Sequence, residues 1–175
     1  MTIERIERLQ ALQRAAGLDY VAIVPGPNLI YFTGLHMHMS ERPIVALIPA
    51  SPAVKPILVT PFFEVGKALS GPVKLNWAVY SYKDGQAFQD AFDAAAREHA
   101  LAGKTVGVEP TQMRVLEWSL LSTAAPIKQA SALDLIASLR MRKDPAEIAA
   151  MRKAAQLAEE VFARLLEDLQ PGMSE

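Results

Sequence analysis

The sequence predicts an α/β fold in which helices cover a mixed β-sheet, with one long helix at the C-terminal end. Short apolar runs rich in strand-forming residues alternate with longer amphipathic segments, which is typical of strands interleaved with helices. Apolar residues make up 51% of the 175 residues and charged residues 21%, so the chain can bury a core. After a basic connector at residues 140–143, a helical pattern continues to about residue 170.

The first expected elements are a helix, a strand and one helical turn. Residues 2–16 predict an amphipathic helix with inward positions Ile6, Leu9, Leu12 and Ala16, and Gly17 is its C-terminal cap. The apolar run at 20–24 predicts a buried strand, which the Pro-Gly-Pro sequence after it ends. A short helical turn follows over residues 29–34, and Gly34 ends it.

The remaining strands and helices alternate up to about residue 139. Prolines bracket a second strand at 44–48, and a third strand at 57–60 forms a hairpin with it. Further strands are expected at 76–80, 105–108 and 127–130, and further helices at 61–69, 86–99, 111–122 and 132–139. Thr111 is expected to cap its helix, and Phe62-Phe63 are expected to pack against the sheet, with an interface patch as the alternative.

The last helix has the clearest start signal in the chain. Asp144 is the expected N-cap, Pro145 takes the first helical position, and Glu147 completes a capping box. Its apolar positions alternate steps of three and four, and they are Ile148, Met151, Ala155, Ala158, Phe162, Leu165 and Leu169. Pro171-Gly172 should end this helix, and Ser174-Glu175 look like the start of another, so we expect the chain to be the front part of a larger protein.

The apolar stripe of helix 144–170 has two interpretations. The helix folds back on the preceding module, or the stripe is left exposed for a partner. An exposed apolar patch of that length usually finds a partner. We therefore expect helix 144–170 to mediate pairing between copies of this chain.

Composition and charge exclude several function classes. A net charge of −1 argues against a dedicated nucleic-acid or anionic-membrane surface. The sequence contains no cysteine, which removes disulfides, thiolate nucleophiles and Cys-based zinc sites. It also contains no secretory signal, no membrane-length apolar run, no G-x-S-x-G motif and no phosphate-binding glycine loop. These features fit a cytoplasmic protein.

Three stretches, taken in order and spacing, resemble one known family. Gly17 to Ala22 follows the first helix, Asn28 to Leu35 reads N-L-I-Y-F-T-G-L, and Leu139 to Ile148 reads L-R-M-R-K-D-P-A-E-I. The second is similar to the N-x-x-Y-L-T-G-F stretch, and the third to the R-x-x-K-x-P-x-E-I junction, of the creatinase/prolidase/aminopeptidase P family. The resemblance covers essentially the whole chain.

The resemblance implies a domain organisation and a chemistry. Residues 1–133 would form the family's N-terminal domain, and residues 134–175 the linker and first helix of a "pita-bread" metallopeptidase domain. Family enzymes bind two divalent metals (Mn, Co or Zn) through two Asp, one His and two Glu inside that second domain. There, metal-activated hydroxide attacks the carbonyl of an Xaa-Pro bond. None of these ligand positions exists in this sequence, so we assign it no catalytic residue and no metal ligand.

The resemblance also implies partners for the longer protein. It would be a homodimer that acts on proline-containing peptides, and this chain alone should be inactive. Two other readings share the fold and stay open. One is a non-catalytic relative that binds peptides or proteins, and the other is a creatinase-like amidinohydrolase, because family analogy alone does not decide function.

Residues 36–42 contain the main cluster of polar side chains in the first half of the chain, and this cluster has three possible interpretations. His36 and His38 would point to the same side of an extended segment, and with Glu41 they make a conceivable zinc set. The second reading is a plain polar loop. The third follows from the resemblance, in which an N-domain loop closes over the partner's cleft. The substrate-rim candidates are then His36, His38, Glu41 and Arg42. Arginine suits a substrate carboxylate because its fork binds bidentately.

Overall fold

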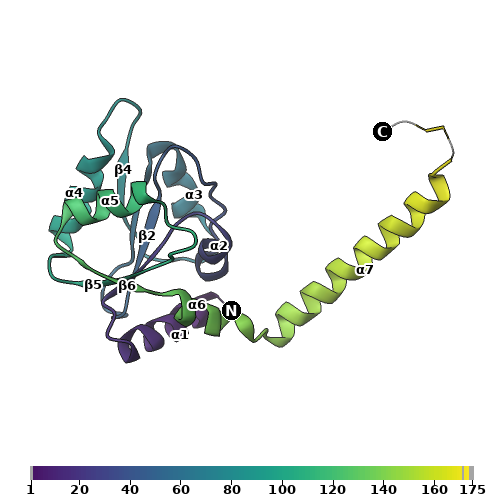
Figure 1. Ribbon diagram of the computed structural model, residues 1–175, viewed down its shortest axis with the longest axis horizontal. Coiled ribbons are helices and arrows are strands. Elements are labelled where there is room, and N and C mark those ends of the chain that lie inside the picture. Colours follow the sequence, from purple (N-terminus) through teal and green to yellow (C-terminus); the bar gives the residue numbers. More distant parts are fainter. Residues whose placement is uncertain (1, 171, 174–175) are drawn as a thin grey trace. The chain divides into compact units, whose positions relative to one another are not determined.

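The computed structural model describes residues 2–170 and 172–173, and the chain divides into two compact units. The first unit, Met1–Leu139, contains the sheet, and the second, Arg140–Glu175, contains one long helix (Figure 1). The predicted α/β class with a mixed sheet and a long C-terminal helix is confirmed. Pro171 and the helix start expected at Ser174-Glu175 lie outside the described residues.

Over residues 2–139 the chain forms a six-stranded mixed sheet with the order β4-β3-β2-β1-β5-β6. The strands are β1 (Tyr20–Ile23), β2 (Val45–Pro49), β3 (Ile57–Pro61), β4 (Ala78–Tyr82), β5 (Thr105–Val108) and β6 (Lys128–Ser131). β2 is antiparallel to both of its neighbours, and the other neighbouring pairs are parallel. The C-terminal ends of β1, β3, β4, β5 and β6 therefore lie at the same edge as the start of β2. We call this the carboxyl edge, and the opposite one the amino edge.

Helices cover both faces of this sheet (Figure 1). They are α1 (Thr2–Ala15), α2 (Pro27–Thr33), the 3₁₀ turn η1 (Phe62–Glu64), α3 (Val65–Ser70), α4 (Phe88–Glu98), α5 (Val115–Ala124) and α6 (Leu133–Met141). Side chains of α1, α2, α3 and α6 join one apolar cluster, and those of α4 and α5 join the other. The first unit is thus a three-layer helix–sheet–helix arrangement.

The central strand β1 explains why two layers of helices are needed. Its four residues are all buried, and they alternate between the two clusters, with Val21 and Ile23 in one and Tyr20 and Ala22 in the other. A strand that is apolar on both faces must be covered on both faces. Gly107 of β5, which pairs with Val21, has no room for a side chain, since a Cβ there would lie 2.8 Å from Leu18 Cδ1.

Several predicted element boundaries differ from the structure; Pro61, for example, ends β3 and does not start a helix, and two further differences have a clear cause. β4 begins at Ala78, not residue 76, because tight backbone turns precede it: Leu75 N–H donates to Val73 and Trp77 N–H donates to Leu75, each at 2.8 Å. Thr111 does not cap α5, which begins at Val115 with Arg114 as its N-cap residue. The carbonyl of Glu109 accepts N–H bonds from residues 112 and 113, so the chain turns once before the helix starts.

The second unit contains α7 (Pro145–Asp168), and its predicted capping box is confirmed. Glu147 N–H donates to Asp144 Oδ1, and Asp144 N–H donates to Glu147 Oε2, each at 2.8 Å. No residue from 145 to 168 is buried, so the predicted apolar positions are accessible; Phe162 is 61% exposed. Among the helices of the described residues, none combines the length and apolar character needed to cross a membrane.

Candidate functional site

The candidate site is the loop of residues 34–44, which joins α2 to β2 at the carboxyl edge and is called the rim loop below. Gly34 begins it with a φ of 70°, the left-handed conformation that ends α2. Leu35 and Met37 are then buried, whereas His36 and His38 are exposed. The alternation places both imidazoles on the outer side of the loop, where they can meet another molecule.

Arg42 is held by two carboxylates and an aromatic ring. Its Nε donates to Asp84 Oδ1 at 3.0 Å and its Nη1 donates to Glu41, while the guanidinium lies 5.6 Å from the centre of the Phe63 ring. The hydrogen bond that Arg42 donates to Asp84, together with the negative charge of Asp84, raises the pKa of Arg42. Arg42 is therefore already paired with Asp84 and Glu41, and a substrate carboxylate must compete with these two acids for the guanidinium.

Phe62 and Phe63 form part of η1 and do not pack against the sheet as expected. They are 56% and 63% exposed. Lys83 Nζ lies 5.0 Å from the centre of the Phe62 ring, and Arg42 lies over the Phe63 ring. Each of the two rings therefore makes a cation–π contact. The alternative reading, an accessible aromatic patch, agrees with this exposure.

The end of the rim loop is anchored by side chains from distant elements. Arg114 Nη1 donates to the carbonyl of Ser40 at 2.6 Å, and Tyr82 O–H donates to the carbonyl of Pro43 at 2.8 Å. Between these two anchors, Arg42 N–H donates to Ser40 Oγ at 3.2 Å. Burial raises the pKa of Tyr82, so its hydroxyl stays protonated and continues to donate. The backbone that presents Arg42 is thus fixed on both sides.

Arg114 is itself held by a buried acid. Glu117, in the first turn of α5, is fully buried, and both of its carboxylate oxygens accept from Arg114 Nε, at 3.0 and 3.1 Å. Arg114 Nη2 also donates to Glu117, and the hydrogen bond to this carboxylate raises the pKa of Arg114. A carboxylate buried this deeply needs such a charged partner.

A second buried acid joins the ends of β1 and β5 at the same edge. Glu109 is 3% exposed, and it accepts the N–H of Val24 at 3.2 Å and a bond from the side-chain amide of Asn28. Asn28 opens the N-L-I-Y-F-T-G-L stretch, and Gly34, its next-to-last residue, ends α2. That stretch therefore fixes α2, and with it the start of the rim loop, to the carboxyl edge.

The described residues do not offer a metal centre. Over residues 2–170 and 172–173, no group of three or more His, Asp or Glu side chains is placed to hold an ion. The conceivable set of His36, His38 and Glu41 is not gathered, since Glu41 binds Arg42 instead. What the loop presents is two imidazoles and a partly neutralised guanidinium, which are groups that can bind a peptide.

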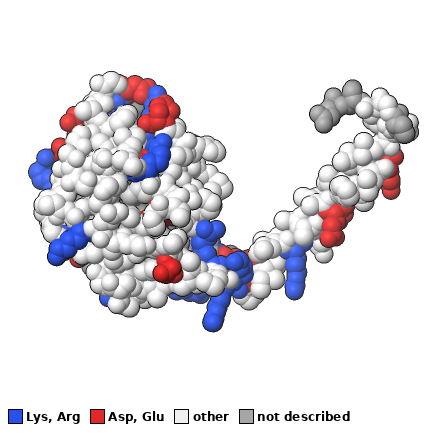
Figure 2. Space-filling model, in the orientation of Figure 1, with Lys and Arg blue, Asp and Glu red and all other residues white. Residues whose placement is uncertain are grey.

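Sequence reasoning found the rim loop and missed the residues that support it. The supporting residues lie 38 or more positions beyond the end of the loop, and nothing in their local sequence marks them; they are Tyr82, Asp84, Arg114 and Glu117. The distribution of charged side chains does not point to a further site on the face that is shown. On the face of the first unit that Figure 2 shows, basic and acidic side chains are interspersed and form no continuous basic patch.

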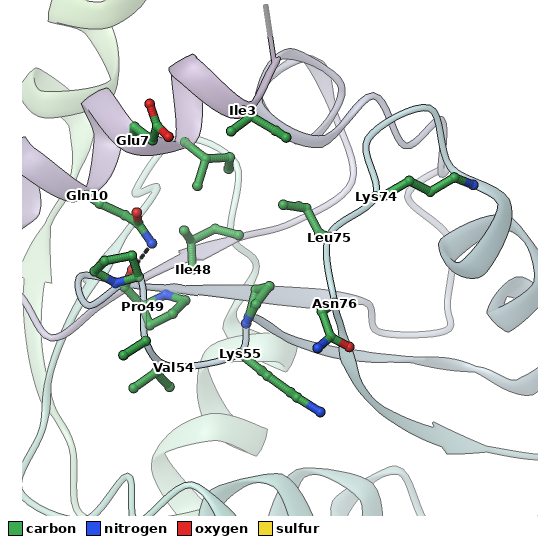
Figure 3. A pocket seen from close by; sticks show the side chains of 14 residues that line it. Ile3, Glu7, Gln10, Ile48, Pro49, Val54, Lys55, Lys74, Leu75 and Asn76 are labelled. Atoms are coloured by element: carbon green, nitrogen blue, oxygen red, sulfur yellow. Dashed lines mark hydrogen bonds between the residues drawn. The ribbon is translucent and has the colours of Figure 1, made fainter.

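The amino edge carries a separate hollow (Figure 3). A cavity of about 390 Å³ lies between α1, the β2–β3 connection and the segment before β4. Its lining is mostly apolar, including Ile6, Ile48 and Leu75, and Gln10 Nε2 donates to the carbonyl of Pro49 at 3.0 Å. The hollow contains no residue of the rim loop.

Comparison with known proteins places these features in context. The sequence profile of the creatinase/prolidase N-terminal domain matches residues 5–142. A curated relative, the probable dipeptidase PepE of Mycobacterium tuberculosis strain H37Rv, is 31% identical over 173 residues, which are 98% of this chain and 44% of that protein. The chain thus spans less than half the length of this relative.

Solved structures agree with the fold. The dipeptidase PepE from Mycobacterium ulcerans is 27% identical with a TM-score of 0.79, and the match covers 99% of this chain and 46% of that one. The creatinase/prolidase N-terminal domain of an X-Pro dipeptidase from Streptococcus pyogenes has a TM-score of 0.67 at 17% identity, and the match covers 79% of this chain and 99% of that one. The second structure is similar in fold alone, and it matches a part of this chain comparable in size to the first unit.

Proposed function

The chain belongs to the creatinase/prolidase N-terminal domain family, and we propose that it serves as the non-catalytic domain of a longer Xaa-Pro dipeptidase. The observation that carries this proposal is the 31% identity to a probable dipeptidase of which the chain matches 44%. Hydrolysis, and two divalent metals such as Mn, Co or Zn, then belong to the part of the longer protein that this sequence does not include.

Within that protein, we assign the rim loop to the wall of the substrate cleft in a homodimer. The loop's exposed His36 and His38 and its anchored Arg42 support this role, because they combine accessibility with a fixed backbone. Arg42 would bind the carboxylate of a short peptide by exchanging one of its present acidic partners. We also propose the cytoplasm as the compartment in which the longer protein works.

The first test compares this chain with the longer protein. Hydrolysis of Xaa-Pro dipeptides is measured side by side with added Mn²⁺, Co²⁺ or Zn²⁺. We expect activity in the longer protein alone. Activity of the 175-residue chain would overturn the proposal and would point back to His36, His38 and Glu41. Silence of both proteins would favour a binding relative or an amidinohydrolase.

The rim role predicts a specific kinetic defect. In the longer protein, Arg42→Ala should raise KM for Xaa-Pro dipeptides about five- to tenfold with little change in kcat, because a charge-assisted contact to bound substrate is lost. Arg97→Ala, which removes an exposed arginine of α4, is the matched control and should leave both constants unchanged. Unchanged kinetics in Arg42→Ala would remove the rim role.

A further inference from the structure

We propose that Arg114 is a positioning residue that holds the rim loop in its substrate-binding geometry. The inference rests on the proposed function, because it concerns how Arg42 reaches a peptide. It adds the residue that precedes α5 as its N-cap, 72 positions along the chain from Arg42, to the residues that form the rim. The contacts run from the buried acid Glu117 to the guanidinium of Arg114, and from there to the rim loop.

The first step is the fixed orientation of Arg114. Glu117 is completely buried, and both of its oxygens accept from Arg114, so the guanidinium plane is held by a bidentate contact with no water competing on the acid's side. The arginine side chain is 35% exposed, so the pair spans from the interior to the surface. Burying an unpaired carboxylate costs free energy, and Glu117 avoids this cost by pairing with Arg114, which also contacts the rim loop.

The second step is the contact that the fixed guanidinium makes with the loop. Nη1 donates to the carbonyl of Ser40 at 2.6 Å, while Nε and Nη2 serve Glu117. Only a side chain with several donors in one rigid plane can serve both partners at once. A lysine at this position can neutralise Glu117, but its single nitrogen is a compact point charge and does not hold the carbonyl of Ser40 in the same way.

The third step leads from Ser40 to Arg42. Ser40 Oγ accepts the N–H of Arg42 at 3.2 Å, and Pro43 on the far side is held by Tyr82. Loss of the Arg114 contact removes the side-chain hydrogen bond that fixes the backbone at Ser40, two residues before Arg42. A loop that must be ordered when substrate arrives binds it more weakly, because the ordering entropy is then lost on binding.

The experiment is a double-mutant cycle in the longer protein with an Xaa-Pro dipeptide. Arg114→Lys keeps Glu117 paired and should raise KM about fivefold while kcat stays near wild type. In an Arg42→Ala background the same substitution should have little further effect, since the group that it positions is already gone. A purely structural role of Arg114 predicts equal effects in both backgrounds, and that result would overturn the inference.

A second measurement uses the 175-residue chain and does not depend on activity. Arg114→Leu combined with Glu117→Leu removes both charges, a replacement that folds commonly tolerate. Amide hydrogen exchange at Arg42 should become at least about fivefold faster in this variant. Lys104→Met, which breaks the ion pair with Asp19 at the amino edge, is the control and should leave it unchanged.

The outcomes separate the two proposals. If Arg42→Ala leaves both KM and kcat unchanged, the rim function itself is overturned. A raised KM in Arg42→Ala, with additive kinetics for Arg114→Lys, overturns the positioning role alone. Unchanged exchange at the Arg42 amide in the double leucine variant also overturns the positioning role, because the loop would then be ordered without the clamp.

Discussion

Asp19 shows how one carboxylate joins two strands that lie far apart in the sequence. It precedes β1 and accepts the N–H of Thr105, the first residue of β5, at 2.8 Å, and Lys104 Nζ lies 3.2 Å away. The backbone bond from Thr105, aided by Lys104, lowers the pKa of Asp19 below its ordinary value of 3.8. The ionised acid therefore favours the folded state.

Asp19→Asn should lower the free energy of unfolding at neutral pH by about 1 kcal/mol, a value reduced for the partial exposure of the pair. The folded pKa lies below the unfolded one, so this contribution is complete above pH 3.8 and is lost as the pH falls through the folded pKa. Urea unfolding at about pH 7 and about pH 3 checks this. The difference from wild type should shrink in acid, and an equal difference at both values would contradict the assignment. Glu7→Gln, an exposed acid of α1, is the control.

The residues of the candidate site divide into those that sequence reasoning could find and those that it could not. His36, His38, Glu41 and Arg42 were identifiable because polar groups cluster within seven positions. Their supports, such as Asp84 and the Arg114–Glu117 pair, come close only through the order of the strands. A single exposed acid is common in any loop, and an Arg and a Glu three residues apart are common on any helical surface. No local signal distinguishes them.

At the scale of elements, the start or end of a helix could be predicted where neighbouring residues alone determine it. The capping box of α7 is complete within four residues, Asp144 to Glu147, and the structure has it. The end of α2 at Gly34 is equally local. The start of α5 failed because Thr111 has the composition of a cap, whereas the carbonyl of Glu109 forms a turn that delays the helix. Glu109 is held in place by β1 and Asn28, and that contact is not local.

The end of α2 offers a test of this local control. Gly34 has a φ of 70°, and a Cβ there would lie 2.4 Å from Cγ of Pro72. Gly34→Ala should therefore lower the free energy of unfolding by about 2 kcal/mol or more, from backbone strain and the clash together. Gly66→Ala is the matched control, since this glycine lies in α3 with nothing within 4 Å of its would-be Cβ. It should be neutral or slightly stabilising. Equal losses in both variants, measured by urea unfolding, would contradict this explanation.

At the scale of the whole molecule, the two units are stabilised differently. The first has apolar clusters on both faces of its sheet, which is the burial that a self-sufficient domain requires. The second is a helix of 24 residues in which none is buried. An isolated helix of this length gains little from propensity alone, so its order depends on what its apolar side meets.

We predict that α7 pairs copies of this chain. Met151 is 59% exposed and Phe162 61%, and their stripe repeats in steps of three and four, the spacing at which two helices pack along a seam. Sedimentation velocity of the 175-residue chain should show a dimer that increases with concentration, whereas residues 1–142 alone should stay monomeric. Met151→Glu with Phe162→Glu should abolish the dimer, because each copy would then bring charges into the seam.

The control for this pairing is Lys153→Glu, which also changes charge on α7 but lies outside the predicted stripe, and it should leave the dimer intact. A chain that stays monomeric at high concentration would contradict the prediction. A dimer that persists in residues 1–142 would place the contact on the first unit instead. In the longer dipeptidase that we propose, we expect the same stripe to pack inside the following domain, so pairing through α7 should disappear there even if that protein is a dimer by other surfaces. The two associations are therefore separable by the Met151 and Phe162 substitutions, which should dissociate this chain but destabilise the longer protein.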